Sequence, residues 1–277
     1  MSAAWPSLIV AVAPNGAYKT KDDHPALPIS ADEIARAAAA CRDAGAAMIH
    51  LHVRDRDGRH LLDAGAYREA IAALRREAGD DMIVQVTSES AQRYATAEQI
   101  AMVRELRPEA VSLALREIVP DAAAEPEAAA FLAWLAAERI APQYIVFTPD
   151  EIERYRDLCG RGVIPGERHF LLFVLGRYSA DQTSEPGDLL PFLAAHDGDS
   201  PWAVCAFGAR EGACALTATA LGGHVRVGFE NNLHLADGAI APDNAALVAQ
   251  ARAGAELLGR DVADAREARD MLWGLID

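Results

Sequence analysis

The sequence predicts an α/β fold, a (β/α)8 TIM barrel with an extra C-terminal helix. Short β-branched runs alternate eight times with longer amphipathic segments along the 277 residues, which is the unit count of such a barrel. The runs are apolar throughout, as expected for parallel strands that are covered on both faces. A doubly wound open sheet is the main alternative, but it usually stops at five or six units. We therefore expect one barrel domain over residues 1–277.

The eight predicted units follow one another without a low-complexity linker. The predicted strands span residues 8–13, 48–53, 82–87, 110–115, 143–147, 169–175, 203–207 and 224–228. The predicted helices span residues 30–44, 63–77, 96–106, 125–139, 149–159, 185–195, 211–221 and 244–258. Ser30, with Glu33 three residues later, predicts a capping box, and Asp63, Thr96 and Thr148 predict further helix caps. A last helix, 264–277, has an apolar stripe that could pack on a neighbouring subunit or internally.

Composition excludes several classes of protein. The net charge of −15 argues against a nucleic-acid surface, which needs clustered Lys and Arg. No apolar stretch approaches the length of roughly 20 residues that crosses a bilayer, and residues 1–14 lack the basic start of a signal peptide. The four scattered cysteines favour reduced, mostly buried thiols. We expect a cytoplasmic protein that binds neither nucleic acid nor membrane.

The stretch MIHLHVRDRDG, residues 48–58, places two histidines on one face of a buried strand. In a strand, residues i and i+2 project to the same side, so His50 and His52 both face the interior or both face the helices. An inward pair near the end of the strand would open into the mouth where barrel enzymes keep their chemistry. Two such imidazoles can bind one metal ion, although hydrogen-bonded core histidines remain the alternative.

A third ligand is expected from the stretch GGHVRVGFENN, residues 222–232. If the chain stays extended from His224, then Arg226, Gly228 and Glu230 share one parity, and Glu230 reaches the mouth of the last strand. Two histidines and one carboxylate with open positions form a catalytic Zn²⁺ pattern, which could also hold Fe²⁺ or Mn²⁺. His224 is not expected to be a ligand. For Glu230, an ordinary helix-capping carboxylate is the alternative.

Polar groups at the other predicted strand ends complete the pattern of an active-site mouth. They are Thr87, Ser88, Glu89, Ser90, Arg116, Glu117, Arg177 and Tyr178, together with Tyr18, Lys19 and Lys21 after the first strand. One or two of these could be surface ion pairs, but a ring of them at every strand exit favours a binding site.

These residues resemble a known family, the β-keto acid cleavage enzymes, whose named member is 3-keto-5-aminohexanoate cleavage enzyme. The likeness lies in HPALPIS, HLHVRDRDG, FVLG, WAVCAFG and GGHVRVGFENN and covers essentially the whole chain in order. It implies a Zn²⁺-dependent (β/α)8 enzyme, usually a homotetramer. Such an enzyme exchanges acyl groups between a β-keto acid and acetyl-CoA, and yields acetoacetate and an acyl-CoA.

The resemblance also implies roles for individual residues. His50, His52 and Glu230 would bind the metal, and Arg226 would work with the catalytic base. Thr87 stands where the family has a serine that contacts the substrate. We further expect Ser88, Tyr18, Lys21 and Arg116 to contribute to substrate binding.

The chain departs from the family pattern at three positions. Asn231 stands where the named enzyme has an aspartate base, and a neutral amide takes no proton at neutral pH. Tyr18 and Ile145 stand where that enzyme has acidic residues, so an aminated substrate is not expected. We keep Asn231 among the catalytic candidates and name Glu89 as the replacement base. An ion pair of Glu89 with Arg93 or Arg116 is the alternative.

Three functions therefore stay open for the chain. The first is acyl exchange in which the metal and Arg226 stabilise an enolate, and CoA lies in the open cleft with Lys19, Lys21 or Arg177 near its phosphates. The second is a metal-dependent aldolase or hydrolase that acts on a keto acid without CoA. The third is a barrel that has lost catalysis and binds a keto acid, a function that Asn231 would support. The acyl chain is not fixed by the sequence.

Overall fold

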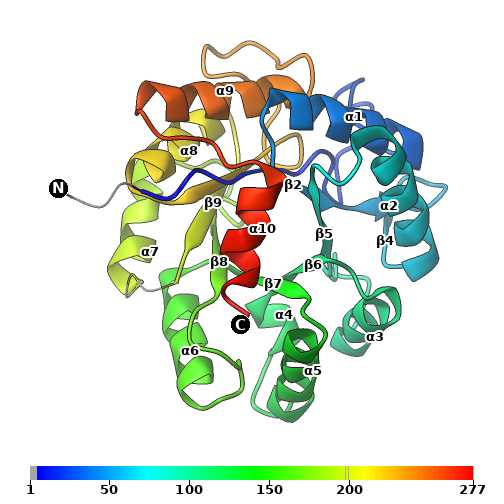
Figure 1. Cartoon of the computed structure of the whole chain (residues 1–277), viewed down its shortest axis with the longest axis vertical. Helices are drawn as coiled ribbons and strands as arrows, with labels where there is room; N and C mark the ends of the chain where they lie inside the picture. Colours follow the sequence, from blue (N-terminus) through cyan, green and yellow to red (C-terminus); the bar gives the residue numbers. More distant parts are fainter. Residues whose placement is uncertain (1–4, 197, 199, 277) are drawn as a thin grey trace.

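The computed structural model describes residues 5–196, 198 and 200–276, and its eight parallel strands form a closed barrel (Figure 1). The strands are β1 (Val10–Val12), β2 (Met48–Leu51), β5 (Ile83–Thr87), β6 (Ala110–Ala114), β7 (Ala141–Val146), β8 (Phe170–Leu175), β9 (Trp202–Ala206) and β10 (His224–Val227). The ring closes where β1 pairs with β10, Val10 opposite Val225. The predicted barrel is confirmed, and the open-sheet alternative is wrong.

Helices follow the strands and surround the ring in Figure 1. They are α1 (Ala31–Ala44), α2 (Ala64–Ala78), α3 (Thr96–Leu106), α4 (Leu115–Ile118), α5 (Glu125–Ala137), α6 (Pro149–Gly160), α7 (Leu189–Ala195), α8 (Glu211–Ala220), α9 (Asn244–Leu257) and α10 (Ala265–Trp273), with a 3-10 turn at Pro186–Asp188 before α7. The short helix α4 was not expected. It directly follows β6 and takes in Arg116 and Glu117, which were predicted to follow the strand.

The predicted helix caps are mostly confirmed. Ser30 and Glu33 form the capping box of α1, and the Asp63 side chain accepts from the backbone of α2. Thr96 is a wrong cap, because Ala95 holds that position and its N–H donates to the Glu98 carboxylate at 2.8 Å. The Thr96 hydroxyl is thereby released and donates to the Glu117 carbonyl. Thr148 stands at the N-cap of α6 but makes no side-chain capping bond.

The second predicted strand, 48–53, is too long, because the chain leaves the barrel after Leu51. Strands β3 (Val53–Arg54) and β4 (His60–Leu61) pair antiparallel as a separate hairpin above the mouth. The Asp-Arg-Asp-Gly stretch between them supplies the turn, in which the Gly58 N–H donates to the Asp55 carbonyl. This hairpin carries His60 back towards the barrel.

Helix α10 closes the barrel at the N-terminal ends of the strands, and Figure 1 shows it across the middle of the ring. Its Ala268 and Leu272 share a buried cluster with Met48 and Ile83 at the strand starts. Several interior positions at this end are alanines, among them Ala110, Ala141 and Ala203, so the strands alone leave the floor unfilled. The predicted last helix therefore packs on its own barrel. Residue 277, its predicted end, lies outside the described residues.

Two class predictions can be compared with the fold. No helix in the described part of the chain is long and apolar enough to cross a membrane. No disulfide joins the cysteines in the described part of the chain, where Cys41, Cys205 and Cys214 are buried and Cys159 is half-buried. Residues 1–4 of the N-terminal segment lie outside the described residues.

Candidate metal centre and active site

His50, His52 and Glu230 converge at the C-terminal end of the barrel. The two imidazole Nε2 atoms lie 3.0 Å apart. Glu230 Oε2 lies 3.4 Å from Nε2 of His52 and 3.7 Å from Nε2 of His50. Ligand atoms at the corners of a tetrahedral zinc site are about 3.3 Å apart when the metal–nitrogen distance is near 2.0–2.1 Å. The three side chains thus surround a space of the size of one metal ion.

Glu230 reaches this position by a turn. The extended continuation of β10 that we predicted is wrong, because the chain bends at Gly228, which has a φ of 136°. A Cβ there would lie 2.4 Å from the Ala13 carbonyl oxygen, so only glycine fits. The Glu230 N–H donates to the same Ala13 carbonyl, and Lys19 Nζ donates to the Glu230 carbonyl at 2.6 Å. Gly16 leaves room for the Glu230 side chain, since a Cβ would lie 2.5 Å from its Cγ.

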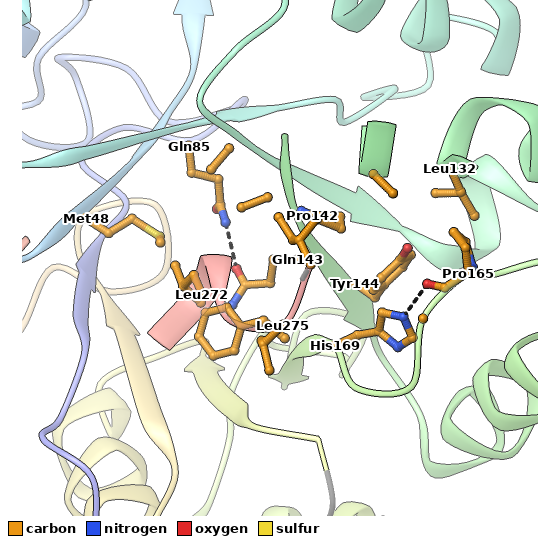
Figure 2. Close-up of a pocket in the computed structure, with 16 residues that line it drawn as sticks. Met48, Gln85, Leu132, Pro142, Gln143, Tyr144, Pro165, His169, Leu272 and Leu275 are labelled. Atoms are coloured by element: carbon orange, nitrogen blue, oxygen red, sulfur yellow. Dashed lines mark hydrogen bonds between the residues drawn. The ribbon is translucent and has the colours of Figure 1, made fainter. Parts of the chain in front are cut away.

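A chain of two side-chain hydrogen bonds supports the imidazole of His50. His50 Nδ1 donates to Gln85 Oε1 at 2.8 Å. Gln85 Nε2 in turn donates to Gln143 Oε1 at 3.1 Å, as Figure 2 shows. With its proton on Nδ1, the ring directs the lone pair of Nε2 towards the metal position.

A second contact orients His52 in the same way. His60 Nε2 donates to the Glu89 carbonyl at 2.8 Å, because a carbonyl oxygen only accepts. Burial, followed by the charge of His52, lowers the pKa of His60 to about 3, so the ring is neutral at pH 7. Its Nδ1 is therefore an acceptor, and His52 Nδ1 faces it at 3.5 Å. Both metal-facing nitrogens then carry lone pairs.

This donor set fits a divalent cation. Two lone pairs 3.0 Å apart repel each other unless a positive charge lies between them. Glu230 Oε2 is buried and accepts no hydrogen bond from the residues that the structure describes. Burial raises the pKa of Glu230, but Arg226 and the imidazoles lower it more, and the result lies well below the ordinary value. Burial and Arg226 lower the pKa of His50 well below its ordinary value. The result is a carboxylate beside a neutral His50 imidazole.

Arg226 extends the site into a small cavity of about 40 Å³. Its Nη2 donates to Glu230 Oε1 at 3.2 Å and to Cys205 Sγ at 3.2 Å. Its Nε and Nη1 are buried and have no partner within the described residues. These two N–H groups are available to an oxygen anion in the cavity. Apolar side chains form the far wall: Ala114, Ile145, Phe147, Val174 and Phe207.

Glu89 lines the same cavity with a carboxylate that is unpaired within the part of the chain that the structure describes. The two arginines that we considered as its partners are engaged elsewhere. Arg93 contacts Asp55 and the His60 carbonyl, and Arg116 donates to Glu151 at 2.6 Å. Burial raises the pKa of Glu89, and the charge of Glu230 adds to that rise.

The other predicted strand-end residues differ in their surroundings. Thr87 lines the cavity, and its hydroxyl accepts from the Glu89 N–H. Ser88 is buried, donates to the Ser112 carbonyl and does not itself line the cavity. The Asn231 amide donates to Glu211 at 3.4 Å and accepts from Cys205 at 3.2 Å. The structure therefore places Asn231 behind the metal ligands rather than in the cavity.

Three predicted substrate-binding residues lie further out. Tyr18 is half-exposed on the rim, under the Arg177 guanidinium. Arg116 stacks on Phe147 and Tyr178 in the neighbouring groove. Lys21 pairs with Glu33 at the start of α1 and does not line the cavity.

Four residues near the ligands were not expected from the sequence: Gln85, His60, Cys205 and Glu211. Gln85 is the one polar residue in the run MIVQV, which is a signal for a special role. The Asp-Gly turn before His60 is a hairpin signal. Glu211 is buried, and it accepts from the Gly228 N–H and from the amides of Asn231 and Asn232. Burial raises the pKa of Glu211 to about 8. It holds the turn that presents Glu230.

A separate cavity of about 110 Å³ lies at the opposite end of the barrel (Figure 2). Leu272 and Leu275 at the C-terminal end of the chain line it, together with Met48 and Gln143. Its lining is mostly apolar and contains none of the metal-facing groups. It is connected to the metal centre through the Gln143–Gln85 hydrogen bond.

Comparison with known proteins finds relatives of this chain. A family model described as beta-keto acid cleavage enzyme matches residues 7–273. A 3-keto-5-aminohexanoate cleavage enzyme from Fusobacterium nucleatum is 34% identical over 96% of this chain and 97% of the relative. A 3-oxoadipate:acetyl-CoA acetyltransferase from Cupriavidus necator is 32% identical over 95% of this chain and 94% of the relative.

Solved structures support the fold. A ternary complex of ObcA with a C4-CoA adduct and oxalate superposes with a TM-score of 0.70 at 18% identity, over 90% of this chain and 67% of that chain. The predicted resemblance and the prediction of an acyl-transferring enzyme are confirmed. From the match over residues 7–273 and these relatives, the chain belongs to the β-keto acid cleavage enzyme family.

Proposed function

We propose that the protein is a zinc-dependent enzyme that exchanges acyl groups between a β-keto acid and acetyl-CoA, and forms acetoacetate and a new acyl-CoA. The observation that carries the proposal is Oε2 of Glu230, which faces two imidazole nitrogens and accepts no hydrogen bond from the described residues, beside Arg226, two of whose donors have no partner among those residues. The names of the relatives that act with acetyl-CoA support the co-substrate.

The metal would be held by Nε2 of His50, Nε2 of His52 and the Glu230 carboxylate. When bound, a divalent cation polarises a keto oxygen of the substrate, an effect worth several kcal/mol. Zinc suits two imidazoles and one carboxylate with open positions. The unpaired Nε and Nη1 of Arg226 donate to the oxygen on which negative charge develops.

Glu89 is the proposed base, because its carboxylate lines the cavity unpaired in the described part of the chain and its pKa is raised. It takes a proton from the carbon between the two carbonyl groups of the β-keto acid. The electron pair left on that carbon attacks the thioester carbonyl of acetyl-CoA, and CoA leaves as its thiolate. The thiolate attacks the original keto carbon, the bond to that carbon breaks, and Glu89 returns the proton to acetoacetate.

Asn231 then has a positioning role rather than an acid–base role. Its amide donates to Glu211, which also accepts from the Gly228 N–H at the bend before Glu230. An aspartate at this position would place a second carboxylate next to that of Glu211. The two would repel each other unless they shared a proton. The amide therefore suits the neighbouring carboxylate of Glu211.

We also propose that residues 1–277 act as one domain, since the strands that carry the site are spread along the chain. A cytoplasmic location and a homotetramer belong to the same proposal and rest on the family resemblance. The lack of a disulfide among the described residues is compatible with a reducing compartment.

The test is a thioester-exchange assay on the zinc-loaded protein with a panel of short β-keto acids and acetyl-CoA. Glu89→Gln should lower kcat by about 10²–10⁴. It should also abolish enzyme-dependent deuterium exchange at the substrate carbon in D₂O, with Glu105→Gln on exposed α3 as the control. Exchange by Glu89→Gln at the wild-type rate would remove Glu89 from the mechanism.

The same assay separates the CoA-free aldolase or hydrolase from acyl exchange. Cleavage of the keto acid at an equal rate with and without acetyl-CoA would overturn the proposed function and favour that alternative.

A further inference from the structure

Arg177 follows β8 at the rim of the active-site cavity, and its guanidinium lies among three aromatic rings. Its Cζ is 5.0 Å from the ring centre of Tyr18, 5.4 Å from Phe207 and 5.6 Å from Tyr178. All three distances fall within the range of a cation–π contact, about 6 Å. The rings of Tyr18, Phe207 and Tyr178 thus form an aromatic cage. The cage fixes the position of the Arg177 side chain, which would otherwise have many rotamers.

The cage leaves the donors of Arg177 unused. Aromatic faces contact the flat faces of a guanidinium, while its five N–H groups point outward in the plane. Within residues 5–196, 198 and 200–276, the guanidinium makes no hydrogen bond and no ion pair with a carboxylate. Arg116 is the instructive comparison: it stacks on the same Tyr178 ring, yet it donates to Glu151 at 2.6 Å. Arg116 therefore has a carboxylate partner for its guanidinium, whereas Arg177 has none among the described residues.

Arg177 stands between two spaces. It lines the small cavity that holds Arg226 and Glu230, and it also lines an open groove of about 300 Å³ beside it. Val174, Phe147 and Tyr178 line both spaces as well, so the two are neighbours across one wall. A molecule that extends out of the metal centre would therefore pass the guanidinium of Arg177.

We propose that Arg177 is an anion-binding residue that receives a charged group of a substrate in its preformed fork. The inference rests on the proposed function, since it places a β-keto acid at the metal centre. Carboxylate and phosphate oxygens both suit the geometry of a guanidinium. The anion is either a second carboxylate at the far end of the β-keto acid or a phosphate of the acyl-carrying co-substrate.

The aromatic cage explains why an anion would bind strongly to Arg177. A guanidinium that is already ordered loses little side-chain freedom when an anion binds, so more of the interaction appears as affinity. The chain carries a net charge of −15, so its overall field repels anions, and a local cation at the rim counteracts that field.

The experiment measures equilibrium binding by calorimetry to zinc-loaded wild type, Arg177→Met, Arg177→Lys and the control Arg210→Met. Arg210 is exposed and pairs with Glu185 on a neighbouring loop. In each of two ligand pairs the second member lacks the anion under test: 3-oxohexanoate lacks the second carboxylate of 3-oxoadipate, and S-acetyl-N-acetylcysteamine lacks the phosphates of acetyl-CoA together with the rest of its nucleotide. Methionine fills the cage without charge, and lysine keeps the charge without the planar fork.

We expect Arg177→Met to weaken the binding of 3-oxoadipate or of acetyl-CoA at least tenfold and to leave the binding of its counterpart, which lacks that anion, unchanged. A loss confined to 3-oxoadipate assigns a substrate carboxylate, and a loss confined to acetyl-CoA assigns a phosphate. Arg177→Lys should fall between wild type and Arg177→Met. Equal binding by wild type and Arg177→Met overturns the inference, as does equal weakening for all four ligands or a wild type that binds neither anion. Wild-type binding without acyl exchange would overturn the proposed function and leave this inference standing.

Discussion

The two ends of the barrel use the same eight strands in opposite ways. At the C-terminal end, the strands present His50, Glu89 and Arg226, and several of their polar atoms have no partner within the described residues. At the N-terminal end, alanines and the apolar side of α10 close the floor, and His224 accepts from the Ile9 N–H at 2.9 Å. Unpaired polar groups cost stability, so their collection at one end indicates where ligands bind.

The difference also separates stability from function. A change at the floor should alter the free energy of unfolding and spare the metal centre. A change at the mouth should impair the metal centre and leave the free energy of unfolding unaltered. Four predictions test this separation, in order of decreasing expected effect.

The largest effect is expected at the mouth, for His52→Ala. Loss of one of three ligands should remove the bound metal and lower kcat/KM about a thousand-fold, because the cation supplies several kcal/mol to the reaction. Metal analysis and steady-state kinetics measure both, with His234→Ala in the loop before α9 as the control. A variant that keeps one equivalent of zinc and its activity would refute the metal centre.

The next effect is expected at the floor, for Leu272→Ala. Leu272 is 5% exposed among the residues that α10 packs against the strand starts. Its truncation should lower the free energy of unfolding by about 2–5 kcal/mol, as measured by urea denaturation. Leu257→Ala, at a position that is 80% exposed on α9, should change stability little. If Leu272→Ala also lowered zinc affinity, the two ends would be coupled rather than separate.

A smaller effect is expected for Gln85→Ala, which removes the acceptor of His50 Nδ1. Outer-sphere partners of this kind contribute about 10–100-fold to metal affinity. Competition with a chromophoric chelator would measure the loss, with Gln250→Ala on α9 as the control. Gln85 is also bonded to Gln143, so this variant tests whether the amide pair connects the floor to the metal. Unchanged zinc affinity would show that His50 needs no such support.

The smallest effect is a pH dependence at the floor. Burial, followed by the charge of Arg260, lowers the pKa of His224 to about 3. The unfolded chain binds a proton near pH 6.5 whereas the folded protein does not, so this contribution is full above that pH and is lost as pH falls towards 3. Between pH 6.5 and 5.5 the loss is about 1 kcal/mol. Thermal melts of wild type and His224→Gln should show a shallower acid slope for the variant, and parallel slopes would contradict the assignment.

Much of the fold could be predicted because it depends on local pattern. The capping box at Ser30 and the apolar runs each depend on a few neighbouring residues. The missed elements are short and interrupt that pattern. The hairpin of β3 and β4 replaces the end of a predicted strand, and α4 starts directly after β6. Thr96 was misread as a cap because the N-cap of α3 lies one residue earlier, at Ala95, whose N–H donates to the Glu98 carboxylate.

The candidate site could be predicted in part. Strand parity placed His50 and His52 on one face, and the structure brings them to 3.0 Å. Parity also predicted that Glu230 reaches the mouth, but it assumed that the chain stays extended after His224. The backbone instead bends at Gly228. The separate surroundings of Ser88, Lys21 and Asn231 could not be derived from spacing. Each depends on a residue that is distant in sequence or on another element.

By itself, the sequence determined the number and order of the strand–helix units, the shared face of the two histidines and the family. Periodicity and short motifs are properties of neighbouring residues, so they survive without coordinates. The tertiary structure alone decided which charged groups find partners: Glu89 and Arg177 do not within the described residues, whereas Arg116 does. That distinction arises only when the ring closes and residues from opposite ends of the chain, such as His52 and Glu230, come within 3.4 Å.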